Sequence, residues 1–174
     1  MIAGGMIART ARLSIREIFA GDAPFVLRLL NDPAFIQNIG DRGVRSVADA
    51  TAYIEKGPRA SYAAHGFGLW LVELADGAAP IGICGILKRD ALPDPDLGFA
   101  FLPEYRSQGY AFEAALCVRG VARDVKRLPR LLAIVNPANA PSIRLLERLG
   151  FAFERSLIMP GESQELSLFA VALC

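Results

Sequence analysis

The segment "DLGFAFLPEYRSQGYAFEAALCVRGVARD", residues 96–124, constrains the fold more than any other part of the chain. It begins with a β-strand pattern that ends at Leu102 and continues through a loop that contains Gly109. After this loop, apolar residues recur every three or four positions and predict one face of the longest helix in the chain. This order of strand, loop and helix leaves unpaired backbone N–H groups at the helix start.

A helix start of this kind can hold an anionic group, because its free N–H groups and the positive end of the helix dipole both favour negative charge. Gly109 would let the anion approach the backbone, and Arg106 would add a charge-assisted contact to phosphate. The residues leave two interpretations open: the loop binds a phosphate group, or it is only a structural connection between a strand and a helix. The loop matches neither GxxxxGK[ST] nor GxGxxG, which disfavours nucleotide hydrolysis and dinucleotide binding.

The first half of the chain predicts a strand, two helices and a strand meander. "RLSIREI" is a partly alternating strand pattern, and Asp22 is the expected N-cap of the helix that follows. Ser46 and Asp49 resemble a capping box for a second helix, near Val47 to Lys56, which we expect Gly57-Pro58 to end. "GLWLVEL" and "IGICGIL" then predict a hairpin, to which "DLGFAFL" adds a third strand.

After the long helix, "RLLAIV" predicts a strand, "PANAPSIRLLERLG" a helix that ends at Gly150, and "FAFERSLI" and "ELSLFAVAL" two closing strands. We therefore expect an α+β fold with a single mixed, mostly antiparallel sheet of about seven strands flanked by about four helices. No repeat or linker interrupts residues 1–174, and 53% hydrophobic residues suffice for one core, so we expect a single domain.

Composition excludes several function classes. Nineteen Lys and Arg against eighteen Asp and Glu give a net charge of +1 without a block of like charges, so we expect no nucleic-acid partner. No apolar run approaches the ~20 residues of a membrane span, and the first residues lack a signal-peptide pattern. Either Met1 or Met6 could be the start.

The three cysteines are an odd number at wide spacing, which argues against a disulfide framework and favours the cytoplasm. Together with the single histidine, His65, they lack the spacing of a zinc site, so we expect no metal. Cys84 and Cys117 fall in strand and helix patterns and are interpreted as small core residues rather than nucleophiles. His65 is interpreted as a solvated loop residue. Phe67 and Trp70 could line a pocket, but aromatic residues in a strand pattern are interpreted as core residues.

Arg106-Ser107-Gln108-Gly109-Tyr110-Ala111 resembles the Q/R-x-x-G-x-G/A pyrophosphate loop of the GNAT superfamily of acetyl-CoA-dependent N-acetyltransferases. "DLGFAFLPEYRSQGYAFEA" and "NPANAPSIRLLERLGFAFE" resemble two motifs of its RimJ/RimL-like branch, and "NDPAFIQNIGDRG" and "GFGLWLVEL" are also similar to it. The resemblance implies that residues 1–174 form one acetyltransferase domain with acetyl-CoA as co-substrate. The residues that it places against CoA are Phe99, Ala100, Phe101, Leu102, Arg106, Ser107, Gln108, Gly109, Tyr110, Ala111, Asn139 and Ser142.

Within this resemblance, Asp96 is a catalytic candidate. An amine attacks a thioester only when it is unprotonated, so a group must accept its proton. GNAT enzymes often carry an acidic residue near the start of the corresponding strand, where it holds a water molecule for this purpose. Asp96 has that position, although a solvated turn carboxylate is the alternative, and Asp94 is the weaker neighbour.

Ser142 is the second catalytic candidate. Asn139, Ser142 and Leu146 fall on one helical face. In many GNAT enzymes the position of Leu146 holds a tyrosine that protonates the CoA sulfur, and leucine cannot do this. The branch places a serine at Ser142, which would hydrogen-bond the leaving thiolate while Asn139 contacts pantetheine; the alternative is that Ser142 only caps the helix.

The resemblance implies direct transfer of the acetyl group from acetyl-CoA to a primary amine in a ternary complex. The acceptor is either a protein N-terminal α-amine or a small molecule, and Asp41 and Arg42 either face it or form a polar turn. The alternative function is a non-catalytic acyl-CoA-binding or regulatory module. We expect no membrane partner, and a monomer or a homodimer.

Overall fold

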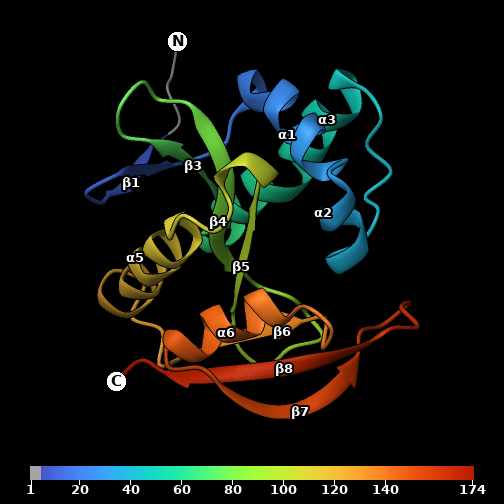
Figure 1. Cartoon of the computed structure of the whole chain (residues 1–174), viewed down its shortest axis with the longest axis vertical. Coiled ribbons are helices and arrows are strands. Elements are labelled where there is room, and N and C mark those ends of the chain that lie inside the picture. Colours follow the sequence, from blue (N-terminus) through green and yellow to red (C-terminus); the bar gives the residue numbers. More distant parts are fainter. Residues whose placement is uncertain (1–4) are drawn as a thin grey trace.

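The computed structural model describes residues 5–174, which form eight strands in one sheet (Figure 1). Met1, one of the two candidate starts, lies outside these residues. The spatial order of the strands is β1-β2-β3-β4-β5-β6-β8-β7. Their bounds are β1 (Met6–Arg9), β2 (Leu13–Arg16), β3 (Leu69–Leu74), β4 (Pro80–Leu87), β5 (Asp96–Phe101), β6 (Arg130–Val135), β7 (Ala152–Ile158) and β8 (Glu165–Ala172).

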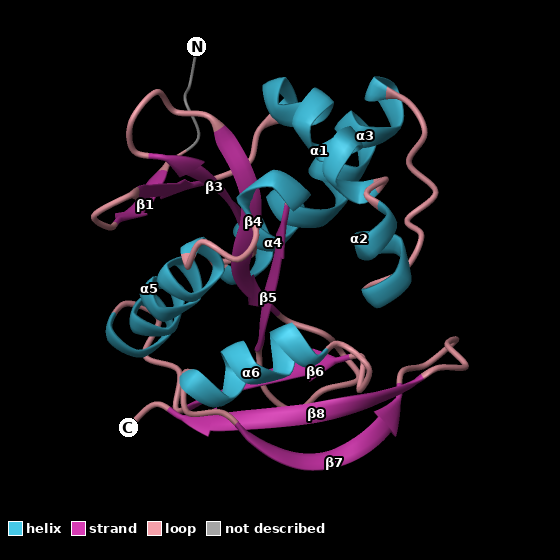
Figure 2. Cartoon of the chain, viewed as in Figure 1, coloured by secondary structure: helices cyan, strands magenta, loops and turns pink. Residues whose placement is uncertain are grey.

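Helices occupy both faces of this sheet (Figure 2). Within residues 5–174, no helix has the combined length and apolar character that crossing a membrane requires. The α-helices are α1 (Ala23–Leu30), α2 (Pro33–Asn38), α3 (Val47–Ile54), α4 (Ala60–His65), α5 (Tyr110–Asp124) and α6 (Ala140–Arg148), and η2 (Glu55–Arg59) is a π-helical turn between α3 and α4.

The core consists of two apolar layers, one on each face of the sheet. Successive side chains of a strand point to opposite faces, so Trp70 and Val72 pack with α5 and α6, whereas Leu71 packs with α1 and α3. All three side chains are at most 1% exposed. Burial of both faces explains why this strand has a nearly continuous apolar sequence.

The sheet is antiparallel except at one pair of neighbours, β5 and β6, which run parallel. This pair has a single registered position, Asp96 with Leu132, whereas β5 and β4 are registered at six positions from Asp96 to Phe101. Beyond Asp96, the edge of β5 that faces β6 therefore forms no ladder of backbone hydrogen bonds with that strand. The two strands separate and leave an opening in the middle of the sheet.

The predicted architecture is confirmed, with one strand and two short helices more than the sequence indicated. The additional elements are β1, α2 and α4. They span only four to six residues each, too few for a periodic pattern to identify them.

The prediction that Gly57-Pro58 ends the second helix was wrong. The chain continues from α3 through the π-helical turn η2, which contains Pro58, into α4. The wider turn accommodates a proline in the helical path, and Pro58 is buried there. The helix ends instead at Gly66, whose φ of +73° is the left-handed conformation of a C-terminal cap.

The two expected N-caps have different outcomes. Ser46 caps α3, because its hydroxyl accepts the Asp49 N–H at 3.0 Å. Asp22 precedes α1 as predicted, but its carboxylate does not cap that helix. Arg16 donates to both carboxylate oxygens of Asp22, at 2.9 and 3.0 Å, because a guanidinium offers a stronger, bidentate partner.

Candidate active site

The open side of β5 is the first component of the candidate site. The Leu102 N–H donates to the Ile81 carbonyl of the neighbouring chain segment at 2.9 Å. Because peptide groups alternate in direction along an antiparallel strand, those of Ala100 also face β4, whereas those of Phe99 and Phe101 face the opening. All four residues from Phe99 to Leu102 were predicted to lie against CoA. Only Phe99 and Phe101 have backbone groups that face the opening and are available to a ligand.

The loop before α5 is the second component. Ser107 and Gly109 both have positive φ, +60° and +83°, with a residue of ordinary φ between them. Such an alternation turns successive N–H groups toward one concave side and suits an anion. Within residues 5–174, the backbone N–H groups of Gln108, Gly109, Tyr110 and Ala111 donate no hydrogen bond. The residues present therefore fit the pyrophosphate that the sequence motif implies.

Arg106 has two partners inside the protein. Its Nε donates to the Phe101 carbonyl at 3.1 Å, and its Nη2 donates to the Asp32 carboxylate at 2.6 Å. Asp32 is 8% exposed and also caps α2. Arg106 thus fastens the end of β5 to the helices on the other face, while its Nη1 makes no hydrogen bond within residues 5–174.

Asp96 lies where β5 and β6 meet, and its side chain is 1% exposed. Both carboxylate oxygens accept from Arg89 Nε, at 3.1 and 3.2 Å. Burial raises the pKa of Asp96, and the nearby Arg89 charge opposes that rise. The alternative of a solvated turn carboxylate is therefore wrong for Asp96. Asp94 lies nearer the surface, paired with Arg130 at 3.3 Å.

Ser142 does not cap α6. Asn139 is the N-cap, and its Oδ1 accepts the Ser142 N–H at 3.3 Å. The Ser142 side chain makes no hydrogen bond with any described residue and is half-buried. One turn further along the same helix face, Leu146 is buried in the core with α5. Ser142 thus has a free hydroxyl on the helix that follows β6.

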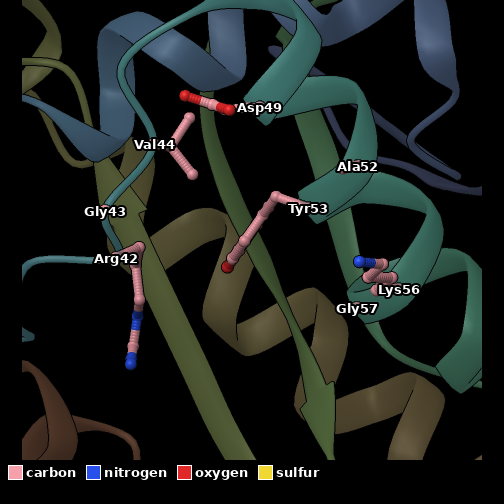
Figure 3. Close-up of a pocket in the computed structure, with 8 residues that line it drawn as sticks. All are labelled: Arg42, Gly43, Val44, Asp49, Ala52, Tyr53, Lys56 and Gly57. Carbon is pink, nitrogen blue, oxygen red and sulfur yellow. The ribbon is translucent and has the colours of Figure 1, made fainter.

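A pocket of about 440 Å³ lies beside α3, on the sheet face opposite α5 (Figure 3). Figure 3 shows the Tyr53 side chain extending from α3 across the strands, between Arg42 and Lys56. Burial raises the pKa of Tyr53, against the opposing charges of Arg42 and Arg89. Arg89 also binds Asp96, so the pocket and Asp96 share a neighbouring charge. Asp41 instead pairs with Arg45 at 2.5 Å.

The remaining predicted residues take structural positions. Trp70 and Phe67 are core residues, as expected. Burial raises the pKa values of Cys84 and Cys117, which disfavours the thiolate that a nucleophile needs. His65 is exposed and lies in the last turn of α4 rather than in a loop. No group of three metal-ligating side chains occurs among residues 5–174.

Sequence reasoning missed four partners of the site: Arg12, Asp32, Arg89 and Glu113. Each acts through a residue distant in sequence or through a side-chain direction that periodicity does not give. Asp32 carried a local signal, because Asp before Pro33 is a typical helix start. Its ion pair with Arg106, 74 residues away in the chain, could not be predicted from any local sequence pattern.

Comparisons with known proteins agree with these features. The acetyltransferase (GNAT) domain family matches residues 12–152. The uncharacterized N-acetyltransferase YnaD of Bacillus subtilis (strain 168) is 30% identical over 147 residues, which cover 83% of this chain and 82% of that protein.

Solved structures show the same fold. The acetyltransferase from Agrobacterium tumefaciens str. C58 superimposes with a TM-score of 0.80 at 24% identity, over 98% of this chain and 96% of that one. RimL, a ribosomal L7/L12 alpha-N-protein acetyltransferase in complex with coenzyme A, has a TM-score of 0.81 at 13% identity, over 96% and 97%. Together with the family match, which includes β5, the loop and α6, these findings show that the chain belongs to the GNAT family of acetyltransferases.

Proposed function

We propose that this acetyltransferase transfers the acetyl group of acetyl-CoA to a primary amine by direct attack in a ternary complex. The observation that carries the proposal is the set of unbonded N–H groups from Gln108 to Ala111 beside the open side of β5. Family membership supports acetyl-CoA as the donor. The coenzyme A in the RimL complex supports the same ligand.

In the proposed complex, the N–H groups from Gln108 to Ala111 bind the pyrophosphate, and Arg106 Nη1 adds a charged contact. Pantetheine follows β5 like an added strand, hydrogen-bonded to the backbone of Phe99 and Phe101. Asn139 contacts it from the start of α6. The thioester that acetyl-CoA supplies then lies near the closed end of the opening, toward Asp96.

The acceptor amine must lose a proton, because its pKa is about 8 for an α-amine and about 10.4 for lysine. We place this proton on a water molecule held by Asp96, whose raised pKa makes its carboxylate a stronger base. A C–N bond forms as the C–S bond breaks. The departing thiolate accepts a hydrogen bond from the Ser142 hydroxyl. The raised pKa values of the buried Cys84 thiol and the half-buried Cys117 thiol support transfer without an acyl-cysteine intermediate.

The acceptor approaches, in this proposal, from the face that carries the Tyr53 pocket. Asp96 and Ala100 share that face of β5, because Leu97 between them points into the opposite core. A protein N-terminus is the acceptor to test first, given the name of RimL, and a small amine is the second. A cytoplasmic monomer or homodimer remains our expectation.

Release of free thiol from acetyl-CoA tests this proposal. Purified protein is incubated with acetyl-CoA and a panel of peptides with free N-termini, polyamines and amino sugars. We expect thiol release that depends on one class of amine and yields one acetylated product per thiol. Binding of acetyl-CoA without release for any acceptor would favour the non-catalytic module instead.

The proton-transfer role of Asp96 is tested by Asp96→Asn, with Asp94→Asn as the matched control. We expect turnover to fall by about 10² or more for Asp96→Asn and to stay unchanged for the control. Because only the carboxylate form is active and its pKa is raised above the ordinary 3.8, wild-type activity should fall on acidification above that pH. An acidic limb that persists in Asp96→Asn would assign it to another group.

A further inference from the structure

Arg12 connects the turn between β1 and β2 to the pyrophosphate loop, 96 residues later in the chain. Its Nη1 donates to the Gln108 carbonyl at 3.0 Å, and its Nε donates to the Glu113 carboxylate at 2.7 Å. Its guanidinium carbon also lies 4.4 Å from the centre of the Tyr110 ring. One side chain thus contacts three residues that lie in the loop or in the first turns of α5.

Glu113 and Thr10 hold Arg12 in this position. The Glu113 carboxylate accepts from the Thr10 hydroxyl at 2.5 Å and from the Arg12 N–H at 3.0 Å, in addition to the guanidinium. Burial opposes ionisation of this carboxylate, but the hydrogen bonds from Thr10 and Arg12 outweigh it and lower the pKa of Glu113. Glu113 is therefore charged at neutral pH and fixes both the backbone and the side chain of Arg12.

The bond from Arg12 determines where one loop amide points. In a planar trans peptide, the carbonyl of one residue and the N–H of the next point in opposite directions. The Gln108 carbonyl faces Arg12, so the Gly109 N–H faces away from it. Arg12 Nη2 also lies 3.2 Å from the place where a Cβ of Gly109 would be, so the Arg12 side chain lies close to the backbone of Gly109 as well.

The exposure of this ion pair argues for a local rather than a global role. The Arg12 side chain is 45% exposed and that of Glu113 is 20% exposed. Ion pairs at such exposure contribute little to global stability, because water and salt screen them. The one hydrogen bond to the Gln108 carbonyl, from a side chain that Glu113 holds in place, can nevertheless fix the orientation of a loop peptide. A misplaced donor loses much of its value to a bound anion.

We propose that Arg12, held by Thr10 and Glu113, is a positioning residue that orients the Gly109 N–H toward the pyrophosphate of CoA. This inference rests on the proposed function, since it concerns the same loop. In the proposed complex, Arg12 does not touch the ligand itself. It acts on the bound phosphate only through the Gln108–Gly109 peptide and the ring of Tyr110.

The test compares CoA with pantetheine, which lacks the pyrophosphate. Arg12→Lys keeps the charge but loses the planar fork, and Glu113→Gln keeps the shape but loses the charge. We expect each variant to raise the Kd for CoA by about tenfold, as for a lost hydrogen bond to a charged group, and to leave the Kd for pantetheine unchanged. At saturating acetyl-CoA, kcat should stay within about twofold of wild type while KM rises.

Arg123→Lys is the matched control, because Arg123 forms an exposed ion pair with Asp124 at the other end of α5. It should leave both Kd values unchanged. Equal losses for CoA and pantetheine, or unchanged CoA binding in both test variants, would overturn the role of Arg12. If Arg12→Lys does not fold, Thr10→Val removes only one hydroxyl and should show the same selective loss. Wild-type protein that binds no CoA would overturn the proposed function as well.

Discussion

α5 and α6 both follow a strand that borders the opening in the sheet, yet their first turns differ in hydrogen bonding. At α6, Asn139 accepts from Ser142 through its side chain and from Ile143 through its carbonyl. The Ala140 N–H donates to Ala138, and Pro141 has no N–H to satisfy. At α5, the cap is a glycine without a side chain, and the loop amides donate to no described residue.

In our proposal only the start of α5 binds the anion, so the helix dipole, which both helices have, cannot be what distinguishes the two starts. Each helix has the positive end of its dipole at its start, but among the described residues only α5 has unused backbone donors there. Backbone N–H groups that make no hydrogen bond are not held in place by a bond of their own, so other contacts must fix their orientation. Arg12 and Arg106 provide it for α5 by bonding carbonyls around the loop, whereas Asn139 holds α6 by bonding its amides directly.

Gly109→Val should have the largest effect on the difference between the two helix starts. It changes the residue whose positive φ shapes the start of α5. A β-branched residue at a φ of +83° costs about 1–3 kcal/mol. Because CoA binding would have to restore this backbone conformation, we expect a loss of about 5- to 150-fold in CoA affinity. The new Cβ would also press against Arg12. Calorimetric titration with CoA measures this. Gly120→Ala, in open space on the same helix, is the control, and CoA affinity equal to wild type in Gly109→Val would remove the loop from the binding site.

Ser142→Ala tests the start of α6, where a side-chain hydroxyl rather than the backbone amides is free to contact a ligand. We expect turnover to fall by about tenfold, since a hydrogen bond to a developing thiolate is lost. CoA affinity should not change. Steady-state kinetics with Ser156→Ala, an exposed serine on β7, as the control measure this effect. Wild-type turnover would show that the hydroxyl takes no part in the reaction.

Asn139→Ala should have the smallest effect on binding and a moderate effect on stability. Loss of an N-cap costs about 1 kcal/mol, which lowers Tm by about 2–4 °C in a domain of this size. CoA affinity should fall only about threefold, through the lost pantetheine contact. Thermal unfolding measures the first quantity, and Asn139→Asp should restore it. An unchanged Tm would mean that the α6 amides do not need their cap.

The sequence predicted the parts of this comparison that are local in the chain. The strand before Gly109, the long helix after it and the helix after Asn139 all follow from periodicity within about fifteen residues. The position of Ser46 as a cap was predictable for the same reason. The opening between β5 and β6 was not, because it depends on how far two strands stay paired.

The contacts that hold the site were beyond prediction for a related reason. Arg12 and Glu113 are 101 positions apart, and neither belongs to an apolar pattern. Asp22 was expected to cap a helix, but Arg16 competes for its carboxylate. Ser142 was a possible cap of α6 and Asn139 was expected only to contact pantetheine, but the backbone path makes Asn139 the cap. Polar side chains have several possible partners, and tertiary structure selects one.

The most direct test of the central claim is the response of individual backbone amides to CoA. Titration of ¹⁵N-labelled protein with CoA, followed by ¹H–¹⁵N correlation spectra, should shift the amides of Gln108, Gly109, Tyr110 and Ala111 most strongly. Pantetheine should leave these four amides nearly unmoved while it shifts residues of β5. If the protein binds CoA and the four amides do not respond, the loop before α5 is not the pyrophosphate site.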